Sequence, residues 1–293
     1  MLMNLLELWL KRRWQPDPAG LERWAGMRPA VVVTGGSEGI GLAIARRFAA
    51  AGQIVVLVAR RPEPLVAAAA AIRREHGAEA LHIPLDVTRA DAADVIESEL
   101  AQRGFYVDVL VNSAGIGLAG EFLRHDPQRI AALLNLNVRA LSLLVRHFLP
   151  GMCRRGRGGI LNVASLGGYA PGPYQSAYYA SKAYVTSLTE ALAWETRGFG
   201  VRVAVLAPGP VRTRFHARMG AERTWYRWLI PAARANSVAW VALLGYRWGR
   251  TVITPGPFAT LTALALRLTP HLLLVPIIGW LLKPRGDSRD VRR

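Results

Sequence analysis

The chain turns at Thr34-Gly35-Gly36-Ser37-Glu38-Gly39-Ile40-Gly41, which lies between a run of β-branched residues and a helical pattern. Gly35 permits the tight turn that leaves a strand, and Gly39 lets the backbone approach a phosphate group without a Cβ in the way. Gly41 allows the helix to pack closely on the strand, and the helix N-terminus offers free N–H groups to an anion. Three glycines alone are compatible with a simple turn. Between a buried strand and a helix, they predict a loop that binds a pyrophosphate.

On both sides of this loop, short apolar runs alternate with longer amphipathic stretches, from Ala30 to Ile253. The short runs are continuously apolar, as strands buried on both faces are. The alternation predicts an α/β fold with a doubly wound parallel β-sheet, a Rossmann-type three-layer sandwich with right-handed crossovers. We expect strands at Ala30–Thr34, Ile54–Val58, Ala80–Pro84, Val107–Val111, Gly159–Val163, Val201–Leu206 and Thr251–Ile253. We expect helices to include Gly39–Ala51, Leu65–His76, Ala90–Arg103, Gln128–Phe148 and Tyr178–Arg197.

The length of 293 residues and the apolar content of 52% suit one α/β domain of roughly 250 residues. We expect three parts. An N-terminal amphipathic extension occupies residues 1–27, and a Rossmann-type dinucleotide-binding catalytic domain occupies residues 28–254. Residues 255–293 form an apolar C-terminal segment that ends in a basic tail.

The formal net charge of +17 indicates an anionic partner, such as nucleic acid, a phosphorylated cofactor or an anionic membrane surface. The excess charge is spread along the chain and no nucleic-acid motif accompanies it, so we expect no specific nucleic-acid partner. Cys153 is the one cysteine in the sequence, which excludes an intramolecular disulfide and fits a reducing compartment. We therefore expect a cytoplasmic protein and leave peripheral membrane association open.

Both ends of the chain are apolar. Basic residues follow the run Met1–Leu10, whereas a secretory signal places them before its apolar run, so we expect no cleaved signal. This run is either a helix that covers a core face or a membrane-surface anchor. The stretch Phe258–Leu282 is interrupted by an arginine, a histidine and two prolines. These interruptions favour a helix packed on the domain or lying on a membrane surface over a membrane span.

The second expected strand ends in Ala59-Arg60-Arg61. An acidic residue at this position binds the ribose 2′-hydroxyl of NAD, whereas arginine attracts the 2′-phosphate of NADP. We therefore predict NADP(H), with Arg60 in contact with the 2′-phosphate and Arg61 in support; a solvated basic loop is the alternative. The acidic Glu38 in the glycine loop weighs against this preference.

Tyr178 and Lys182 are four residues apart on an expected helix and so share one face. A tyrosine with its ordinary pKa of about 10 is a poor acid–base catalyst at neutral pH, and a neighbouring ammonium group lowers that pKa. Such a pair occurs often by chance. By itself it would be a surface pair.

The surrounding motifs change this interpretation. Ser165 lies thirteen residues before Tyr178, at the end of the expected fifth strand. Asn112-Ser113-Ala114-Gly115 closes the fourth strand and Asn137 follows in the next helix. Pro208-Gly209 follows the sixth strand, shortly before Thr213. In order and spacing, the region from Arg28 to Ile253 resembles the short-chain dehydrogenase/reductase family.

The resemblance implies a role for each matching residue. Tyr178 would be the acid in reduction and the base in oxidation. Lys182 would lower the pKa of Tyr178 and hold the nicotinamide ribose, Ser165 would bind the substrate oxygen, and Asn137 would position a water in a proton relay. We expect no metal. Members of the family often dimerise through the helices that bear Asn137 and Tyr178, so a homodimer is left open. The expected cofactor contacts are Thr34, Gly35, Ser37, Glu38, Gly39, Ile40, Gly41, Arg60, Arg61, Asp86, Val87, Asn112, Ala114, Gly115, Tyr178, Lys182, Pro208, Gly209, Val211 and Thr213.

Residues 212–228, where the family covers its substrate, interleave arginines with aromatic residues. They form either an apolar lid with a basic rim or an exposed loop whose rings pack on the C-terminal helix. We expect His216 to be a solvated loop residue and Tyr179 to be a packing residue. The sequence as a whole predicts an NADP(H)-dependent oxidoreductase that reduces a carbonyl or oxidises a secondary alcohol of a hydrophobic or lipid-like small molecule. The alternative is a non-catalytic dinucleotide-binding sensor or scaffold at a membrane surface.

Overall fold

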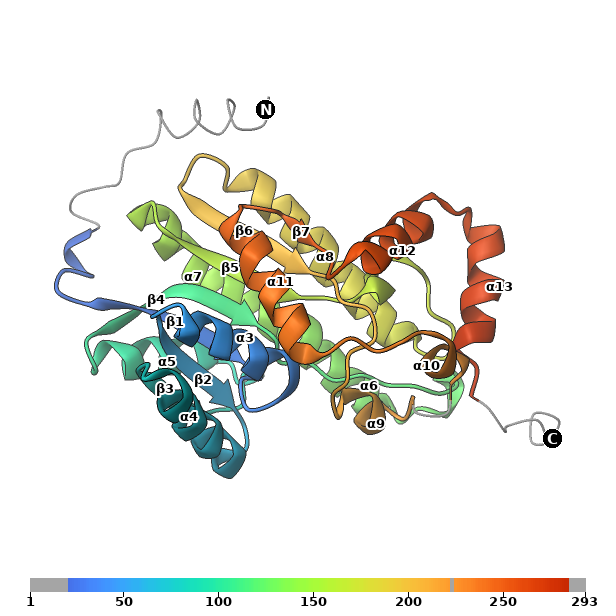
Figure 1. Ribbon diagram of the computed structural model, residues 1–293, viewed down its shortest axis with the longest axis horizontal. Coiled ribbons are helices and arrows are strands. Elements are labelled where there is room, and N and C mark those ends of the chain that lie inside the picture. The colour runs from blue at the N-terminus through green and yellow to red at the C-terminus, as the bar shows by residue number, and fades with distance from the viewer. Residues whose placement is uncertain (1–20, 222–223, 285–293) are drawn as a thin grey trace.

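The computed structural model describes residues 21–221 and 224–284, and in that part of the chain seven strands form one parallel sheet (Figure 1). The strand order is β3-β2-β1-β4-β5-β6-β7. Each strand predicted from the sequence is present, with its ends shifted by at most two residues. The strands are β1 (Arg28–Thr34), β2 (Ile54–Ala59), β3 (Ala80–Pro84), β4 (Phe105–Asn112), β5 (Gly158–Val163), β6 (Val201–Leu206) and β7 (Val252–Ile253).

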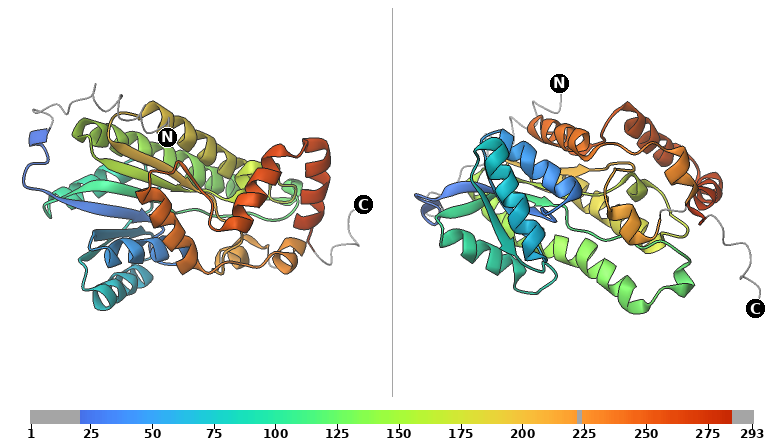
Figure 2. Two further views of the ribbon diagram at one scale, coloured as in Figure 1. Left: turned by 45° about the horizontal axis from the view of Figure 1, so that its top comes forward. Right: turned by 60° about the horizontal axis from the view of Figure 1, so that its bottom comes forward.

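Helices connect the strands and cover both faces of the sheet, which confirms the predicted three-layer sandwich (Figures 1 and 2). The α-helices are α3 (Gly39–Ala50), α4 (Pro62–His76), α5 (Ala92–Ala101), α6 (Pro127–Leu134), α7 (Leu141–Arg155), α8 (Ser176–Glu195), α9 (Phe215–Met219), α10 (Trp225–Leu229), α11 (Ala235–Arg247), α12 (Pro257–Leu268) and α13 (His271–Leu282). Short 3₁₀ turns are found at Phe122–Arg124 and Leu166–Tyr169.

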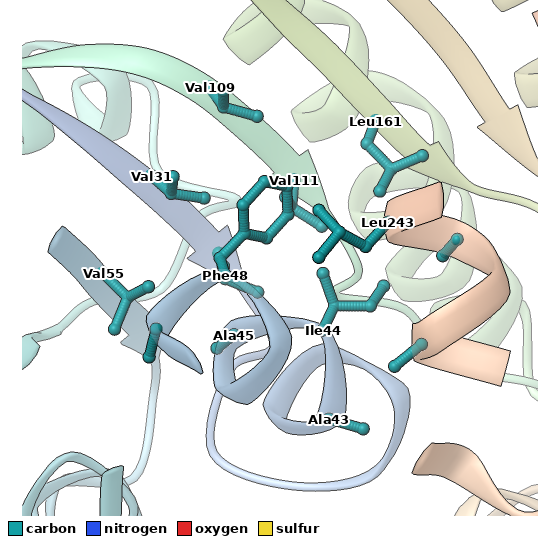
Figure 3. Close-up of a cluster of buried hydrophobic side chains, with 14 of the residues drawn as sticks. Val31, Ala43, Ile44, Ala45, Phe48, Val55, Val109, Val111, Leu161 and Leu243 are labelled. Carbon is teal, nitrogen blue, oxygen red and sulfur yellow. The ribbon is translucent and has the colours of Figure 1, made fainter. Parts of the chain in front are cut away.

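Two hydrophobic clusters lie on opposite faces of the sheet. Val31 and Val33 of β1 enter the cluster formed with α3, α4 and α11, whereas Ala30 and Val32 enter the cluster formed with α5, α7 and α8. Figure 3 shows the first cluster, where Phe48 of α3 lies among side chains of the sheet. Because alternate side chains of a strand point to opposite faces, both sets must be apolar. The continuous apolar runs in the sequence follow from this arrangement.

The strand order reverses between β1 and β4, whose parallel register pairs Thr34 with Asn112 at their carboxyl ends. In doubly wound sheets, ligands bind in the crevice that this reversal opens. The glycine loop leaves β1 at this edge, and the 112–117 segment leaves β4 beside it. The topology thus brings the predicted phosphate loop and the predicted catalytic side chains to one edge of the sheet.

The expected continuous helix over Gln128–Phe148 is wrong in one respect, because a π-helix (Asn135–Ala140) separates α6 from α7. Asn137 explains the irregularity. Its Nδ2 donates to the Ile116 carbonyl at 2.8 Å, and its Oδ1 accepts from the Ile116 N–H at 3.0 Å. A π-helical turn re-aims a side chain, and such turns occur frequently at functional sites.

The helices α12 and α13 follow β7 and lie together at one end of the molecule, away from β3 (Figure 2). Within residues 21–221 and 224–284, no helix combines the length and apolarity that a membrane crossing requires. The predicted N-terminal helix at Met1–Leu10 and the basic tail at residues 285–293 lie outside the described residues.

Candidate active site

The glycine loop is closely packed against the segment that follows β4. Gly35 has a φ of +66°, and a Cβ there would lie 2.8 Å from the Ala114 nitrogen. A Cβ on Gly41 would overlap the carbonyl oxygen of Gly35. Both positions therefore exclude a larger side chain, and the loop leaves its backbone N–H groups at the start of α3, where they suit a phosphate group.

Replacing Gly41 with alanine should therefore distort the loop. We expect dinucleotide binding to weaken by at least about tenfold and the free energy of unfolding to fall by about 1–3 kcal/mol, because the added methyl group meets backbone that cannot move aside. Equilibrium titration with nucleotide and denaturant unfolding would measure the two effects. Gly151→Ala in α7 is the matched control, since its Cβ would meet its nearest neighbours at 3.5 Å. Equal behaviour of the two variants would contradict this account of the loop.

Four side chains predicted to be catalytic meet at the carboxyl edge of the sheet. Ser165 follows β5, Tyr178 and Lys182 lie one turn apart on α8, and Asn137 lies in the π-helix. The Ser165 side chain lies close enough to Tyr178 to lower the pKa of its hydroxyl. A Cβ placed on Gly115 would lie 3.2 Å from the Asn137 Oδ1 and 3.6 Å from the Lys182 Nζ, so these two groups converge on the Gly115 backbone.

Hydrogen bonds hold Lys182 and Asn137 in place. The Lys182 Nζ donates to the Val163 carbonyl at 2.8 Å, at the end of β5. The Asn137 Nδ2 donates to the Ser181 Oγ at 3.1 Å, and the Ser181 hydroxyl donates to the Tyr178 carbonyl at 2.7 Å. The π-helix is thereby connected to α8 at the residue that neighbours Lys182.

Burial dominates the protonation of the tyrosine–lysine pair. It raises the pKa of Tyr178 well above its ordinary value, and the hydrogen bond with Ser165 offsets part of this effect. Burial lowers the pKa of Lys182 from 10.5 to about 8. The Lys182 Nζ lies 5.8 Å from the centroid of the Tyr178 ring. The ammonium is thus near the ring, but Ser165 is the group that lowers the pKa of Tyr178 in this arrangement.

Two predicted cofactor residues, Thr34 and Asn112, lie behind the cavity wall and do not line it. The Thr34 Oγ1 accepts from the Ser113 and Ala114 N–H groups at 3.1 and 3.2 Å, so it fixes the segment after β4. Asn137 also lies behind the wall. These residues do not line the cavity, and Thr34 and Asn137 fix the backbone segments that do.

A buried chain of hydrogen bonds was not expected from the sequence. The Asn112 Nδ2 donates to the Asn162 Oδ1 at 2.9 Å, and the Asn162 Nδ2 donates to the Thr189 Oγ1 at 2.9 Å. This chain links β4, β5 and α8. A polar residue inside the apolar run of β5 was the signal that could have revealed it, because a buried amide requires partners.

The cavity along this edge has a volume of about 1450 Å³. One end is formed by the glycine loop, Arg60, Arg61 and the Asp86-Val87 segment. The other end lies beyond Tyr178, where α9, α10, α12 and α13 contribute mostly apolar side chains. The predicted residues Ser165, Lys182, Pro208, Gly209, Val211 and Thr213 line the passage between the two ends.

Glu38 is surrounded by arginines. Arg218 of α9 binds both of its carboxylate oxygens, with the Nη2 at 3.0 Å from Oε2, and the Arg61 Nη2 lies 3.5 Å from Oε1. The hydrogen bond from Arg218 lowers the pKa of Glu38. The negative charge that weighed against NADP is therefore balanced by arginines. Arg60 lies farther out, with its Nη1 3.9 Å from the Asp86 Oδ2.

The segment after β6 is folded, and two expectations about it need revision. His216 is not a solvated loop residue, because its Nδ1 is 2.9 Å from the Tyr226 hydroxyl and it lines the cavity. Trp225 stacks on Trp280 of α13 with a ring separation of 5.6 Å, so the segment both covers the cavity and packs on the C-terminal helix. The two interpretations of this segment were not exclusive.

Tyr179 is held between two glycines. A Cβ on Gly172 would overlap its ring, and a Cβ on Gly167 would lie 3.1 Å from it, so the ring packs closely against both positions. The expectation that Tyr179 packs is confirmed in this respect.

Comparison with known proteins agrees with this geometry. The model of the short chain dehydrogenase family matches residues 29–224. A short chain dehydrogenase of Pseudocercospora fijiensis is 38% identical over 189 residues, which are 64% of this chain and 60% of that protein. The chain thus spans less than two thirds of that relative's length.

Two solved structures show the same architecture. A short-chain dehydrogenase of Sphingobium yanoikuyae in complex with NADPH is 32% identical, with a TM-score of 0.73 over 81% of this chain and 92% of that one. A short chain dehydrogenase/reductase of Burkholderia phymatum in complex with NAD is 25% identical, with a TM-score of 0.74 over the same shares. The chain belongs to the short chain dehydrogenase family and has its Rossmann fold.

Proposed function

We propose that this protein is an NADP(H)-dependent oxidoreductase that reduces a carbonyl or oxidises a secondary alcohol of a hydrophobic small molecule. One observation carries the proposal. The side chains of Ser165 and Tyr178 lie together where the cavity passes from the glycine-loop end to the apolar end, close enough for Ser165 to lower the pKa of Tyr178. A substrate oxygen at this point is within reach of both hydroxyl groups.

The roles of these residues follow from their chemistry. In reduction, the bound dinucleotide supplies the hydride and Tyr178 gives a proton to the substrate oxygen; in oxidation, Tyr178 takes that proton away. Ser165 orients the oxygen. Lys182 stabilises the phenolate through its positive charge once both groups face the same ligand. Asn137 binds the Ile116 backbone and, through Ser181, fixes the position of α8 relative to it.

The predicted preference for NADP(H) is supported by Arg60 and Arg61 at the end of β2 and by the compensation of Glu38. Structures of relatives hold either NADPH or NAD, so the preference must come from this chain's own residues. The Arg61 guanidinium lies 3.5 Å from Glu38, whereas Arg60 is more exposed and its Nη1 lies 3.9 Å from the Asp86 carboxylate. Arg60 is therefore the better placed of the two to bind a 2′-phosphate.

Replacing Arg60 with aspartate is expected to weaken NADPH binding by at least about tenfold and to leave NADH binding unchanged or stronger, because a charge-assisted bond is replaced by repulsion. Fluorescence titration with each nucleotide measures this directly. Arg74→Asp, on the exposed last turn of α4, controls for the change in net charge. Stronger binding of NADH than NADPH by the wild-type protein would refute the preference, and no binding of either by a folded protein would favour the non-catalytic alternative.

The apolar end of the cavity supports a hydrophobic substrate. Leu266 of α12 and Ile278 and Leu281 of α13 line it, and the cluster around Leu118, Leu133 and Tyr178 closes it. Apolar walls of this kind bind ligands by removing apolar surface from water.

The outer faces of α12 and α13 support membrane contact as a second part of the proposal. Residues 255–284 contain no aspartate or glutamate. Exposed apolar side chains without acidic groups among them fit the interface of an anionic bilayer. The same two helices line the cavity, so a substrate dissolved in lipid would enter beside them. The exposed apolar side chains are Phe258, Leu261, Leu264, Leu268, Leu272, Leu273, Ile277 and Trp280.

Vesicle sedimentation tests this contact. We expect the protein to bind vesicles of phosphatidylcholine and phosphatidylglycerol. The double variant Leu268→Glu with Leu272→Glu should bind at least about tenfold more weakly, since two exposed leucines that would be buried in lipid are replaced by charged side chains. Val66→Glu is the control, because Val66 is 43% exposed on α4, at the opposite end of the molecule from α12 and α13 (Figure 1). Equal binding by the double variant and the control variant would show that this surface does not touch lipid. A cytoplasmic location and a homodimer through the helices that bear Asn137 and Tyr178 stay predictions.

A further inference from the structure

A buried amide lies three residues before the proposed catalytic tyrosine. Gln175 precedes α8, its side chain is 2% exposed, and it lines the cavity. Within the described residues, its Nε2 has no hydrogen-bond partner. A buried amide without a partner is unfavourable, so its presence in a cavity wall indicates a ligand that supplies the missing acceptor.

Other polar groups that line this cavity have partners. The Ser165 Oγ accepts from the Gly167 N–H at 3.1 Å. The Tyr226 hydroxyl is paired with the His216 Nδ1 at 2.9 Å. None of these hydrogen bonds involves the Gln175 Nε2. The rest of this wall is apolar, with Leu166, Ile230 and Leu281 among its residues.

We propose that the Gln175 amide donates a hydrogen bond to a second oxygen of the substrate, so that the preferred substrates are hydrophobic ketones that carry a second carbonyl or ester oxygen near the reacting carbonyl. This inference rests on the proposed function, because Tyr178 must act on the first oxygen. Gln175 stands at the N-cap of α8, three residues before Tyr178, and both side chains line the same cavity, so one substrate can meet both groups. An isolated ketone leaves the amide without a partner.

Two ketones of nearly the same shape separate this role from general binding. Methyl 3-oxooctanoate and 5-decanone have chains of equal length, and only the first has an ester oxygen β to the ketone. We would measure kcat/KM for both with the wild-type protein, with Gln175→Met, and with Gln128→Met on the first turn of α6 as control. The greater intrinsic reactivity of the oxo ester cancels when variants are compared by the ratio of the two values.

We expect Gln175→Met to lower this ratio by about tenfold, the loss of one buried hydrogen bond, while its activity on 5-decanone stays the same or increases. Gln128→Met should leave the ratio unchanged. An unchanged ratio in an active Gln175→Met protein would overturn the inference and leave the proposed function intact.

Binding measurements cover the case in which the wild-type protein reduces neither ketone. The proposed function would then fail, and thermal-shift titrations of the nucleotide-saturated protein would decide the inference. A preference for the oxo ester that is present in the wild-type protein and lost in Gln175→Met would support it. No preference, or no binding of either ketone, would overturn it.

Discussion

Replacing Tyr178 with phenylalanine is expected to lower kcat by about 10²–10⁴-fold in both reaction directions, because the group that exchanges the proton with the substrate oxygen is lost. Dinucleotide affinity should stay within about threefold of the wild-type value, since the ring and its packing against Phe215 remain. Steady-state kinetics and nucleotide titration on the same preparations measure both quantities.

Tyr179→Phe is the matched control for this variant. It removes one hydroxyl from an adjacent tyrosine whose ring stays between Gly167 and Gly172. We expect its kcat to remain within a few-fold of the wild-type value. A Tyr179→Phe protein as inactive as Tyr178→Phe would show that the proton does not pass specifically through Tyr178.

Replacing Lys182 with methionine should have the second largest effect. Burial raises the pKa of Tyr178, so without the neighbouring positive charge the phenolate is scarcely populated at neutral pH. We expect alcohol oxidation at pH 8 to slow by about 10²–10⁴-fold and its pH profile to shift to higher pH. Carbonyl reduction uses the neutral phenol and should lose less. Equal losses in both directions with no shift of the profile would contradict this role.

The stability of the same variant supplies an independent readout. The pKa of Lys182 is about 8 in the folded protein and near 10.5 in the unfolded chain, so between these values the unfolded chain binds more protons. The contribution of Lys182 to the free energy of unfolding therefore rises with pH across this window and is constant below it. Lys182→Met should remove this rise. Denaturant unfolding at pH 7 and pH 10 would measure it.

The sheet could be predicted from sequence because its physical cause is local. Strands buried on both faces require continuous apolar runs, and the runs at β1 and β5 end beside glycine or serine at the edge where ligands bind. The convergence of Ser165, Tyr178 and Lys182 followed from the resemblance, and the structure brings these side chains together. Their chemical roles stay predictions.

Other features depend on contacts between distant residues. Glu38 and Arg218 are 180 positions apart, so nothing near Glu38 indicated that its charge would be balanced. The pairing of His216 with Tyr226 depends on how α9 and α10 fold over the cavity. The π-helix at Asn137 arises from hydrogen bonds to the Ile116 backbone, which a helical periodicity does not reveal.

The most direct test of the central claim is a single-turnover reaction of the wild-type protein with NADPH and a hydrophobic oxo ester, followed by nucleotide absorbance. The account predicts a transient that is slowed when the transferred hydride carries deuterium and that is lost in Tyr178→Phe with NADPH still bound. A folded, NADPH-bound protein that consumes no nucleotide with any of a panel of hydrophobic ketones, or a Tyr178→Phe protein as fast as the wild type, would contradict it.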